Sequence, residues 1–275
     1  MVDPGTYTNF VVDGNDPSSV SSVSILAASG SFTLTPVPGA PEIIVRDVPA
    51  GSVVTIIGVQ ISYADPLAPA VLVIDNAGAV RLSELDVQRA GNVIGSTAQA
   101  CVEVQNTATF WLIDSSIWSA TDWAGSTFNP RLAGGISNDG FSALQFVDSK
   151  GVVQNSRLRG YYNCNTFSPT GYGGDGLRAV GTNTSVWLLE DNVSAAFATT
   201  CRGGDGNYGG NAVHQFRTPT DKNRIQVLNT RIPVDVMELK ASTPAGLEGS
   251  CDVFGLAGST SAEHPRFEIL LRQQE

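Results

Sequence analysis

The sequence is poor in charge for its length. Only 15% of its 275 residues are charged, and the 16 Lys and Arg are outnumbered by 26 Asp and Glu. A surface that follows nucleic-acid phosphates needs clustered Lys and Arg, so the composition argues against a nucleic-acid partner. Lys, Glu and Met are scarce, whereas Val, Ser, Thr, Asn and Gly are abundant. This bias favours strands and turns over helices.

Long apolar runs and metal-type cysteine pairs are also missing. No stretch reaches the ~18 apolar residues of a membrane span. The four cysteines show no CxxC spacing, and there are only two histidines. Met1-Val-Asp-Pro-Gly-Thr-Tyr7 is turn-and-strand sequence without the charged and apolar regions of a secretion signal. We therefore expect either a cytosolic protein or a secreted one whose signal segment lies outside this sequence.

One eight-residue pattern occurs six times, starting at residues 54, 80, 110, 151, 186 and 225. The copy Val186-Trp-Leu-Leu-Glu-Asp-Asn-Val193 shows it well. Two alternating apolar positions come first, a polar residue or glycine stands at the fifth place, and an aliphatic residue at the eighth. The copies are 26, 30, 41, 35 and 39 residues apart, which is the range of periods found in solenoid proteins.

Each repeat carries a second strand before this pattern and a shorter third strand after it. In three repeats the first two strands start nine residues apart, at 71 and 80, 101 and 110, and 177 and 186. We therefore expect a fixed turn between these strands and insertions elsewhere. The pattern predicts an all-β protein: one right-handed parallel β-helix of about seven coils, with like strands stacked ~4.8 Å apart.

The β-helix is assigned to residues 1–240, with a capping or incomplete first coil. Residues 241–275 leave the repeat pattern and are assigned to a C-terminal cap or tail packed on the helix. Such a cap is expected because a solenoid must cover its last apolar layer.

Over roughly residues 4–240 the chain resembles the pectin-lyase-like superfamily, in particular secreted bacterial proteins with a right-handed β-helix region. Pro4-Gly-Thr-Tyr7 and Val48-Pro-Ala-Gly51, each before a strand, look like the opening coils of these proteins. The resemblance implies the fold and a secreted or cell-surface location. The polygalacturonase motifs Asn-Thr-Asp and Gly-His-Gly are absent, and so is the pectate-lyase calcium site with its catalytic Arg. One fold hosts many activities, so no reaction follows from it.

Residues at corresponding places in successive coils become neighbours in a β-helix. The fifth template place is predicted to form a polar turn ladder, with side chains bonding to backbone groups of the next coil. The second place should face outward, because strand side chains alternate. Trp111 and Trp187 would then lie two coils apart on a flat face, where they could stack on sugar rings or anchor a partner. The alternative is that a loop or another subunit covers them. The second template place is occupied by Thr55, Arg81, Trp111, Val152, Trp187 and Gln226.

Three insertions rich in Gly and aromatic residues precede first strands, and function on a rigid scaffold usually lies in such loops. They span residues 121–139, 165–175 and 202–211. Tyr172, Tyr208 and Arg217, in or beside them, are candidate binding residues. Cys164 and Cys201 hold corresponding places in neighbouring coils, so a disulfide between them is a candidate that would imply an oxidising compartment. Two separate thiols are the alternative.

The insertions also lead to candidate catalytic residues. Arg178 and His214 hold the same strand position in adjacent coils, and Asp175 and Asp205 lie in the loops nearby. A carboxylate, an imidazole and a guanidinium together could perform acid–base chemistry on a polysaccharide. The structural alternative is a Gly-Asp-Gly turn that Arg and His bridge. Gly203-Gly-Asp-Gly206 loosely matches calcium-binding repeats, but the periodic array is missing, so we expect no metal and no cofactor, with calcium as the weaker alternative.

Three hypotheses remain for function. The first is an extracellular or cell-surface scaffold that binds a glycan or a protein partner through loops on one edge, without catalysis. The second is a polysaccharide lyase or glycoside hydrolase that uses Asp175, Asp205, Arg178 and His214. The third is a structural repeat module of a larger surface protein. The missing enzyme signatures favour the first hypothesis, and the insertions gathered on one edge favour the second. The oligomeric state is left open.

Overall fold

The computed structural model describes residues 6–16, 22–26, 32–34, 39–64, 68–89, 100–118, 142–160, 175–194, 213–216, 224–228, 230, 254–257 and 268–270. Within these ranges the chain forms 23 strands and no helix. The described part accordingly has no helix that could cross a membrane. The strands form three sheets, and every strand pair is parallel.

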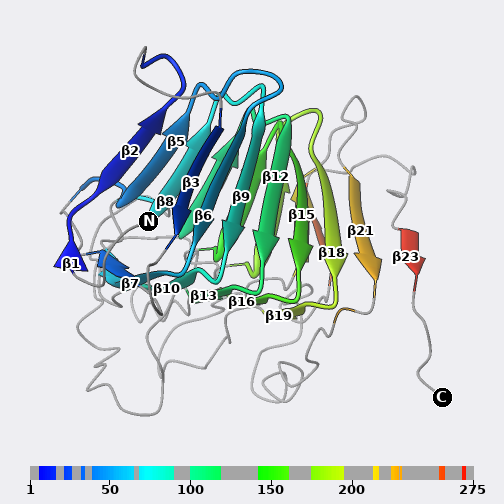
Figure 1. Ribbon diagram of the computed structural model, residues 1–275. Helices are drawn as coiled ribbons and strands as arrows, with labels where there is room; N and C mark the ends of the chain where they lie inside the picture. Colours follow the sequence, from blue (N-terminus) through cyan, green and yellow to red (C-terminus); the bar gives the residue numbers. More distant parts are fainter. Residues whose placement is uncertain are drawn as a thin grey trace, which may run out of the picture.

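The three sheets are visited in turn as the chain coils (Figure 1). Sheet 1 contains β1 (Thr6–Tyr7), β4 (Phe32–Leu34), β7 (Val59–Ala64), β10 (Asp86–Arg89), β13 (Ser116–Trp118), β16 (Arg157–Arg159) and β19 (Asn192–Ser194). Sheet 2 contains β2 (Phe10–Asp13), β5 (Ile43–Arg46), β8 (Val71–Ile74), β11 (Val102–Gln105), β14 (Leu144–Val147), β17 (Leu177–Val180), β20 (Val213–Phe216) and β22 (Phe254–Ala257). Sheet 3 contains β3 (Ser22–Leu26), β6 (Val53–Ile57), β9 (Ala79–Ser83), β12 (Thr109–Ile113), β15 (Lys150–Gln154), β18 (Ser185–Leu189), β21 (Arg224–Leu228) and β23 (Glu268–Leu270).

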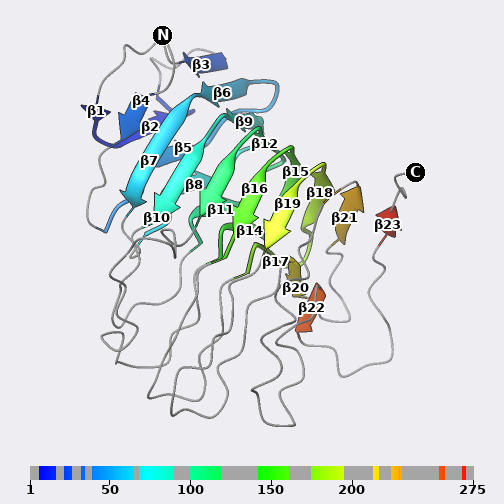
Figure 2. The same ribbon diagram turned by 90° about the horizontal axis from the view of Figure 1, so that it is seen from below.

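This arrangement is a parallel β-helix, which confirms the fold class predicted from the repeats. Strands β1 to β3 lie at one end of the stack and β22 and β23 at the other (Figure 2). The last two strands pair with β20 and β21, so sheets 2 and 3 extend into the segment that the sequence assigns to a cap or tail.

The core is made by alternate residues of each strand. Val71 and Val73 of β8 are fully buried, whereas Leu72 and Ile74 on the same strand are only partly buried. The same alternation recurs across sheets 2 and 3, so columns of Val, Ile, Leu and Phe fill the interior of the coils. Burial of these columns is the main stabilising contribution, at roughly 25 cal/mol per Å² of apolar surface removed from water.

A small residue makes room for an aromatic contact in the core. Phe110 of β12 and Phe146 of β14 are both fully buried, with ring centroids 5.7 Å apart in an edge-to-face arrangement. Gly151 follows Phe110 in the inward column of sheet 3. A Cβ atom at Gly151 would collide with Cε1 of Phe146 and would lie only 2.7 Å from its Cζ. The ring of Phe146 therefore occupies the space that a side chain at Gly151 would need.

Left-handed backbone explains the polar or glycine residue at the fifth template place. These residues have φ between 49° and 77°, a region that Gly, Asn and Asp tolerate better than other residues. They form the corner between sheets 3 and 1, namely Gly58, Glu84, Asp114, Asn155 and Glu190. A second left-handed column, with φ between 44° and 88°, forms the corner between sheets 2 and 3, namely Asp47, Asp75, Asn106, Asp148 and Gly181.

The residue after each fifth place carries a buried hydrogen-bond ladder from coil to coil. The backbone N–H of Leu85 donates to Oγ of Ser115 at 3.1 Å, and that of Ser115 donates to Oγ of Ser156 at 3.1 Å. The N–H of Ser156 donates to Oδ1 of Asp191 at 2.7 Å, and that of Asp191 to Oγ1 of Thr230 at 3.3 Å. Bonding to backbone of the neighbouring coil thus lies at the sixth place, one residue later than the sequence predicts.

A similar ladder runs along the other corner. The N–H of Val48 donates to Oδ1 of Asn76 at 3.0 Å, and Nδ2 of Asn76 donates to Oγ1 of Thr107 at 3.3 Å. The N–H of Thr107 donates in turn to Oγ of Ser149 at 3.0 Å. Because buried N–H groups are costly when unpaired, these side chains satisfy corner backbone that the sheets cannot reach.

The turn between sheets 2 and 3 varies in length, so the prediction of a fixed turn is wrong. Val102, not Cys101, pairs with Val71, and Leu144 pairs with Val102. We counted the residues that separate each left-handed corner residue from the sheet 3 strand that follows it. There are three after Asp75, two after Asn106, one after Asp148 and three after Gly181. Two short turns are therefore flanked by two longer ones.

Candidate functional site

The outer face of sheet 3 carries the tryptophans that the repeat pattern points to. Trp111 pairs with Val152, which pairs with Trp187, so the three residues form one column across β12, β15 and β18. Their neighbours Phe110, Leu112, Val186 and Leu188 are fully buried, which places the column on the outside. We call these three residues the tryptophan column.

The tryptophan column is accessible. The side chain of Trp187 is 37% exposed, among the highest values for a large apolar residue in the described part of the chain. Trp111 is partly buried, between Arg81 and Val152 in the same column. The two tryptophans are two coils apart, or about 9.6 Å along the stack. The ring of Trp187 therefore offers a stacking surface on the outer face of sheet 3, with the partly buried Trp111 in the same column.

Polar residues flank the tryptophan column within the same sheet. Lys150 and Gln154, at the two ends of β15, are exposed. Thr109 and Ser185 lie at the starts of β12 and β18, on the same side as Lys150. These groups can donate to or accept from the hydroxyls of a ligand held against the rings.

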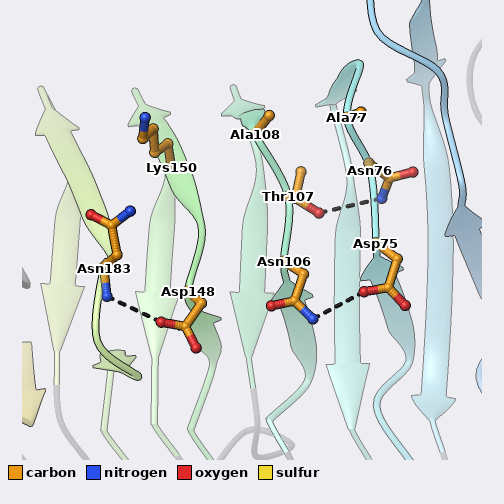
Figure 3. A pocket seen from close by; sticks show the side chains of 9 residues that line it. All are labelled: Asp75, Asn76, Ala77, Asn106, Thr107, Ala108, Asp148, Lys150 and Asn183. Carbon is orange, nitrogen blue, oxygen red and sulfur yellow. Dashed lines mark hydrogen bonds between the residues drawn. The ribbon is translucent and has the colours of Figure 1, made fainter.

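The two short turns produce a notch at the corner between sheets 2 and 3. Its volume is about 510 Å³, and it runs along the stack beside the starts of β12 and β15. Figure 3 shows Asp75, Asn106 and Asp148 in a row across neighbouring coils, with Ala77 and Asn183 in the longer turns at either end. We call this the corner notch.

Hydrogen bonds hold the polar side chains of the corner notch in place. Nδ2 of Asn106 donates to Oδ1 of Asp75 at 2.9 Å (Figure 3). The backbone N–H groups of Thr182 and Asn183 donate to Oδ1 of Asp148 at 2.6 and 3.0 Å. The bond from Thr182 is the main reason that the pKa of Asp148 lies below its usual value. The notch therefore presents an ionised carboxylate and amides in fixed positions.

A second polar column lies on the outer face of sheet 2. Glu103, Gln145, Arg178 and His214 follow one another in register across β11, β14, β17 and β20. Glu103 is only 7% exposed, and its Oε1 accepts from Nε2 of Gln105 at 2.7 Å and from Nε2 of Gln145 at 3.2 Å. We call the four register partners the sheet 2 polar column.

The register brings Arg178 and His214 side by side, as the repeats predict. Leu177 and Ala179 are fully buried, so Arg178 points to the outside of sheet 2, where it is partly buried. Asp175 precedes the same strand and is 5% exposed, and its N–H lies 3.4 Å from Oγ of Ser142. The catalytic roles of these residues stay predictions.

Sequence reasoning missed Glu103 and Gln145. The nine-residue spacing aligns Cys101 with Val71, one residue too early, because Cys101 is as fully buried as Val102. The observed register shifts this strand by one residue, which places Glu103 and its partner Gln145 in the column of Arg178 and His214. The corner notch was missed for the same reason, because the shift concealed the shortened turns.

Several predicted site residues lie outside the described residues, namely Asp205, Tyr172, Tyr208, Arg217, Cys164 and Cys201. His214 lies in a described strand, but nothing is described of its side chain. The described cysteine, Cys101, is a fully buried thiol. In the described part of the chain, no three His, Cys, Asp or Glu side chains are grouped to hold a metal ion. Gly203-Gly-Asp-Gly206 falls outside that part.

Comparison with known proteins adds no family to this description. No family model matches the chain, and neither curated proteins nor solved structures gave a significant match. The fold that the structure shows is that of a parallel β-helix protein.

Proposed function

We propose that this chain is an extracellular or cell-surface β-helix scaffold of the pectin-lyase-like type that binds a glycan without cleaving it. The observation that carries the proposal is the tryptophan column. Its two rings stand in register on an outward face, and one of them is 37% exposed. A stacked sheet is rigid, so the rings are positioned before a ligand arrives, which lowers the entropy cost of binding.

The tryptophan column supports this proposal better than the loop edge does. The loops that the sequence predicts to form the binding edge lie largely outside the described residues. The column lies on strands whose backbone is fixed on both sides by neighbouring coils. The described surface thus offers a specific place for a sugar chain, with the loops as a further contact.

Replacing either tryptophan by alanine is expected to weaken glycan binding about tenfold, because each ring supplies a central apolar contact. Retardation of Trp111→Ala and Trp187→Ala is measured in native gels cast with a panel of soluble polysaccharides. Val53→Ala is the matched control, since Val53 is 39% exposed on the same sheet but outside the column.

Unchanged retardation in both tryptophan variants would contradict this location of the site. A further contrary outcome is a wild-type chain that binds no polysaccharide but self-associates in sedimentation, with self-association lost in Trp187→Ala. The tryptophan column would then be a contact between copies of the chain.

The sheet 2 polar column favours a second candidate function, a polysaccharide lyase or glycoside hydrolase. A glutamate that is only 7% exposed on the outside of a sheet is uncommon, and the register partners that follow Glu103 are Gln145, Arg178 and His214. Under this proposal Glu103 or His214 would serve as the acid or base, and Arg178 would bind a charged group of the substrate.

The enzyme candidate predicts new reducing ends or unsaturated products from a polysaccharide, and loss of at least 100-fold of that rate in Glu103→Gln. Glutamine preserves the size of the side chain and can still accept from Gln105 and Gln145. Trp187→Ala should retain the rate at saturating substrate. Absence of product across acidic and neutral polysaccharides, with and without calcium, would exclude this candidate and leave the binding scaffold.

A further inference from the structure

The charge around the outer face of sheet 3 is unfavourable for an acidic ligand. Both corners that border the sheet carry acidic side chains, namely Asp47, Asp75, Asp148, Glu84, Asp114 and Glu190. The described outward residues of strands β6 to β21 include three cations, Arg81, Lys150 and Arg224. Beyond the three cations of the face itself, a row of acidic side chains thus lies along each bordering corner, in a chain whose net charge is −10.

This charge balance argues for a neutral glycan. A glycan that carries uronate or sulfate groups and lies along sheet 3 would run between two rows of acidic side chains. At low ionic strength its negative charges would be repelled by both rows. The hydroxyls of a neutral sugar, by contrast, can donate to the carboxylates and amides of the corner notch. The notch spans four coils (Figure 3), and the tryptophan column crosses β12, β15 and β18 of the same stack, so both features run from coil to coil.

The spacing of the tryptophans restricts the linkage. The two side chains project from the same face of sheet 3, on strands that are two coils apart. This separation is about 9.6 Å along the stack. In an extended β-1,4-linked chain successive sugars are turned over, so the same ring face recurs at every second sugar. The length of such a disaccharide repeat is close to the two-coil distance. A β-1,3-linked chain is curved and does not present its rings along a straight line.

We infer that the ligand of the tryptophan column is a neutral, β-1,4-linked glycan that lies along the stack, perpendicular to the strands. Trp111 and Trp187 stack on alternate sugars, Val152 contacts the sugar between them, and hydroxyls on one side face Lys150 and the corner notch. This inference rests on the proposed function and adds to it the class of glycan.

The test compares oligosaccharides of equal length by tryptophan fluorescence and calorimetry at low ionic strength. Cellohexaose and chitohexaose represent the neutral β-1,4 class, laminarihexaose a neutral β-1,3 chain, and hexagalacturonate an acidic one. At least one β-1,4 hexasaccharide is expected to bind ten or more times more tightly than laminarihexaose and hexagalacturonate, a difference of about 1.4 kcal/mol or more. Its affinity should fall about tenfold in Trp111→Ala and in Trp187→Ala, and should be unchanged in Val53→Ala.

The outcomes separate this inference from the proposed function. Equal or tighter binding of hexagalacturonate would overturn the neutral class, and equal binding of laminarihexaose would overturn the linkage, while glycan binding itself would stand. Polysaccharide retardation without binding of either β-1,4 hexasaccharide would also overturn the inference alone. If no polysaccharide is retarded and no hexasaccharide binds, both proposals fail.

Discussion

We expect the free energy of unfolding of Asp191→Ser, relative to that of the wild type, to increase with pH. The increase between about pH 4 and about pH 7.5 is expected to be on the order of 4 kcal/mol. Asp191 is 3% exposed and stands in a ladder whose other members are Ser115, Ser156 and Thr230. Burial, with a smaller contribution from the charge of Glu190, raises the pKa of Asp191 from 3.8 to about 7, against the effect of backbone hydrogen bonds from Ser156 and Leu189.

The direction follows from this shift. The folded protein keeps the proton of Asp191 up to about pH 7, whereas the unfolded chain releases it near pH 3.8. The stability that the protonated carboxyl contributes is fully present below pH 3.8 and is lost as the pH rises to about 7. Serine has no proton to lose in this range, and it can accept from the N–H of Ser156 as Ser156 itself accepts from Ser115.

The measurement is the free energy of unfolding in urea, for both proteins, at closely spaced pH values. The difference between the two curves isolates Asp191, because all other groups are shared. A difference that widens between pH 4 and pH 7 and is constant above it is expected. Parallel curves over this whole range would show that burial does not raise the pKa of Asp191 in the folded protein.

Replacing Gly151 with valine is expected to lower the free energy of unfolding by about 3 kcal/mol, at the upper end of the usual cost of overpacking. The new side chain would occupy the position of the Phe146 ring, whose Cζ lies 2.7 Å from a Cβ built on Gly151. Phe146 cannot turn away freely, because it is fully buried and packs edge-to-face on Phe110. Chemical denaturation followed by circular dichroism measures the loss.

The double variant tests whether the collision with Phe146 is the cause. Phe146→Ala alone should cost about 3–5 kcal/mol, because it leaves a cavity. In that background Gly151→Val should cost much less than in the wild type, since valine enters the vacated space. Additive losses in the double variant would rule out this packing explanation.

The fold could be predicted because its determinants are local. Alternating apolar residues mark the inward face of each strand, and the left-handed corners favour Gly, Asn and Asp at the fifth place, where Glu84 and Glu190 also stand. In sheet 3 these two signals fix the register, so the column of Trp111 and Trp187 is evident from the sequence alone.

The register of sheet 2 was harder to predict, because buried residues continue beyond its strands. Cys101 is as fully buried as Val102, so alternation does not define where the strand begins. The resulting one-residue error hid both Glu103 and the shortened turn at Asn106. The Gly-rich insertions have no repeating pattern to align, and the contributions of Asp205, Tyr172 and Tyr208 stay predictions.

Oxidative footprinting of tryptophans can show whether a glycan lies on the outer face of sheet 3. Hydroxyl radicals modify exposed side chains, and Trp118 on the outer face of sheet 1, with Arg159 5.4 Å from its ring centroid, serves as an internal control. In the presence of a retained polysaccharide, protection is expected at Trp187 and Trp111 and not at Trp118. Protection at Trp118 or at the sheet 2 polar column, with Trp187 modified as in the free protein, would show that the glycan binds elsewhere.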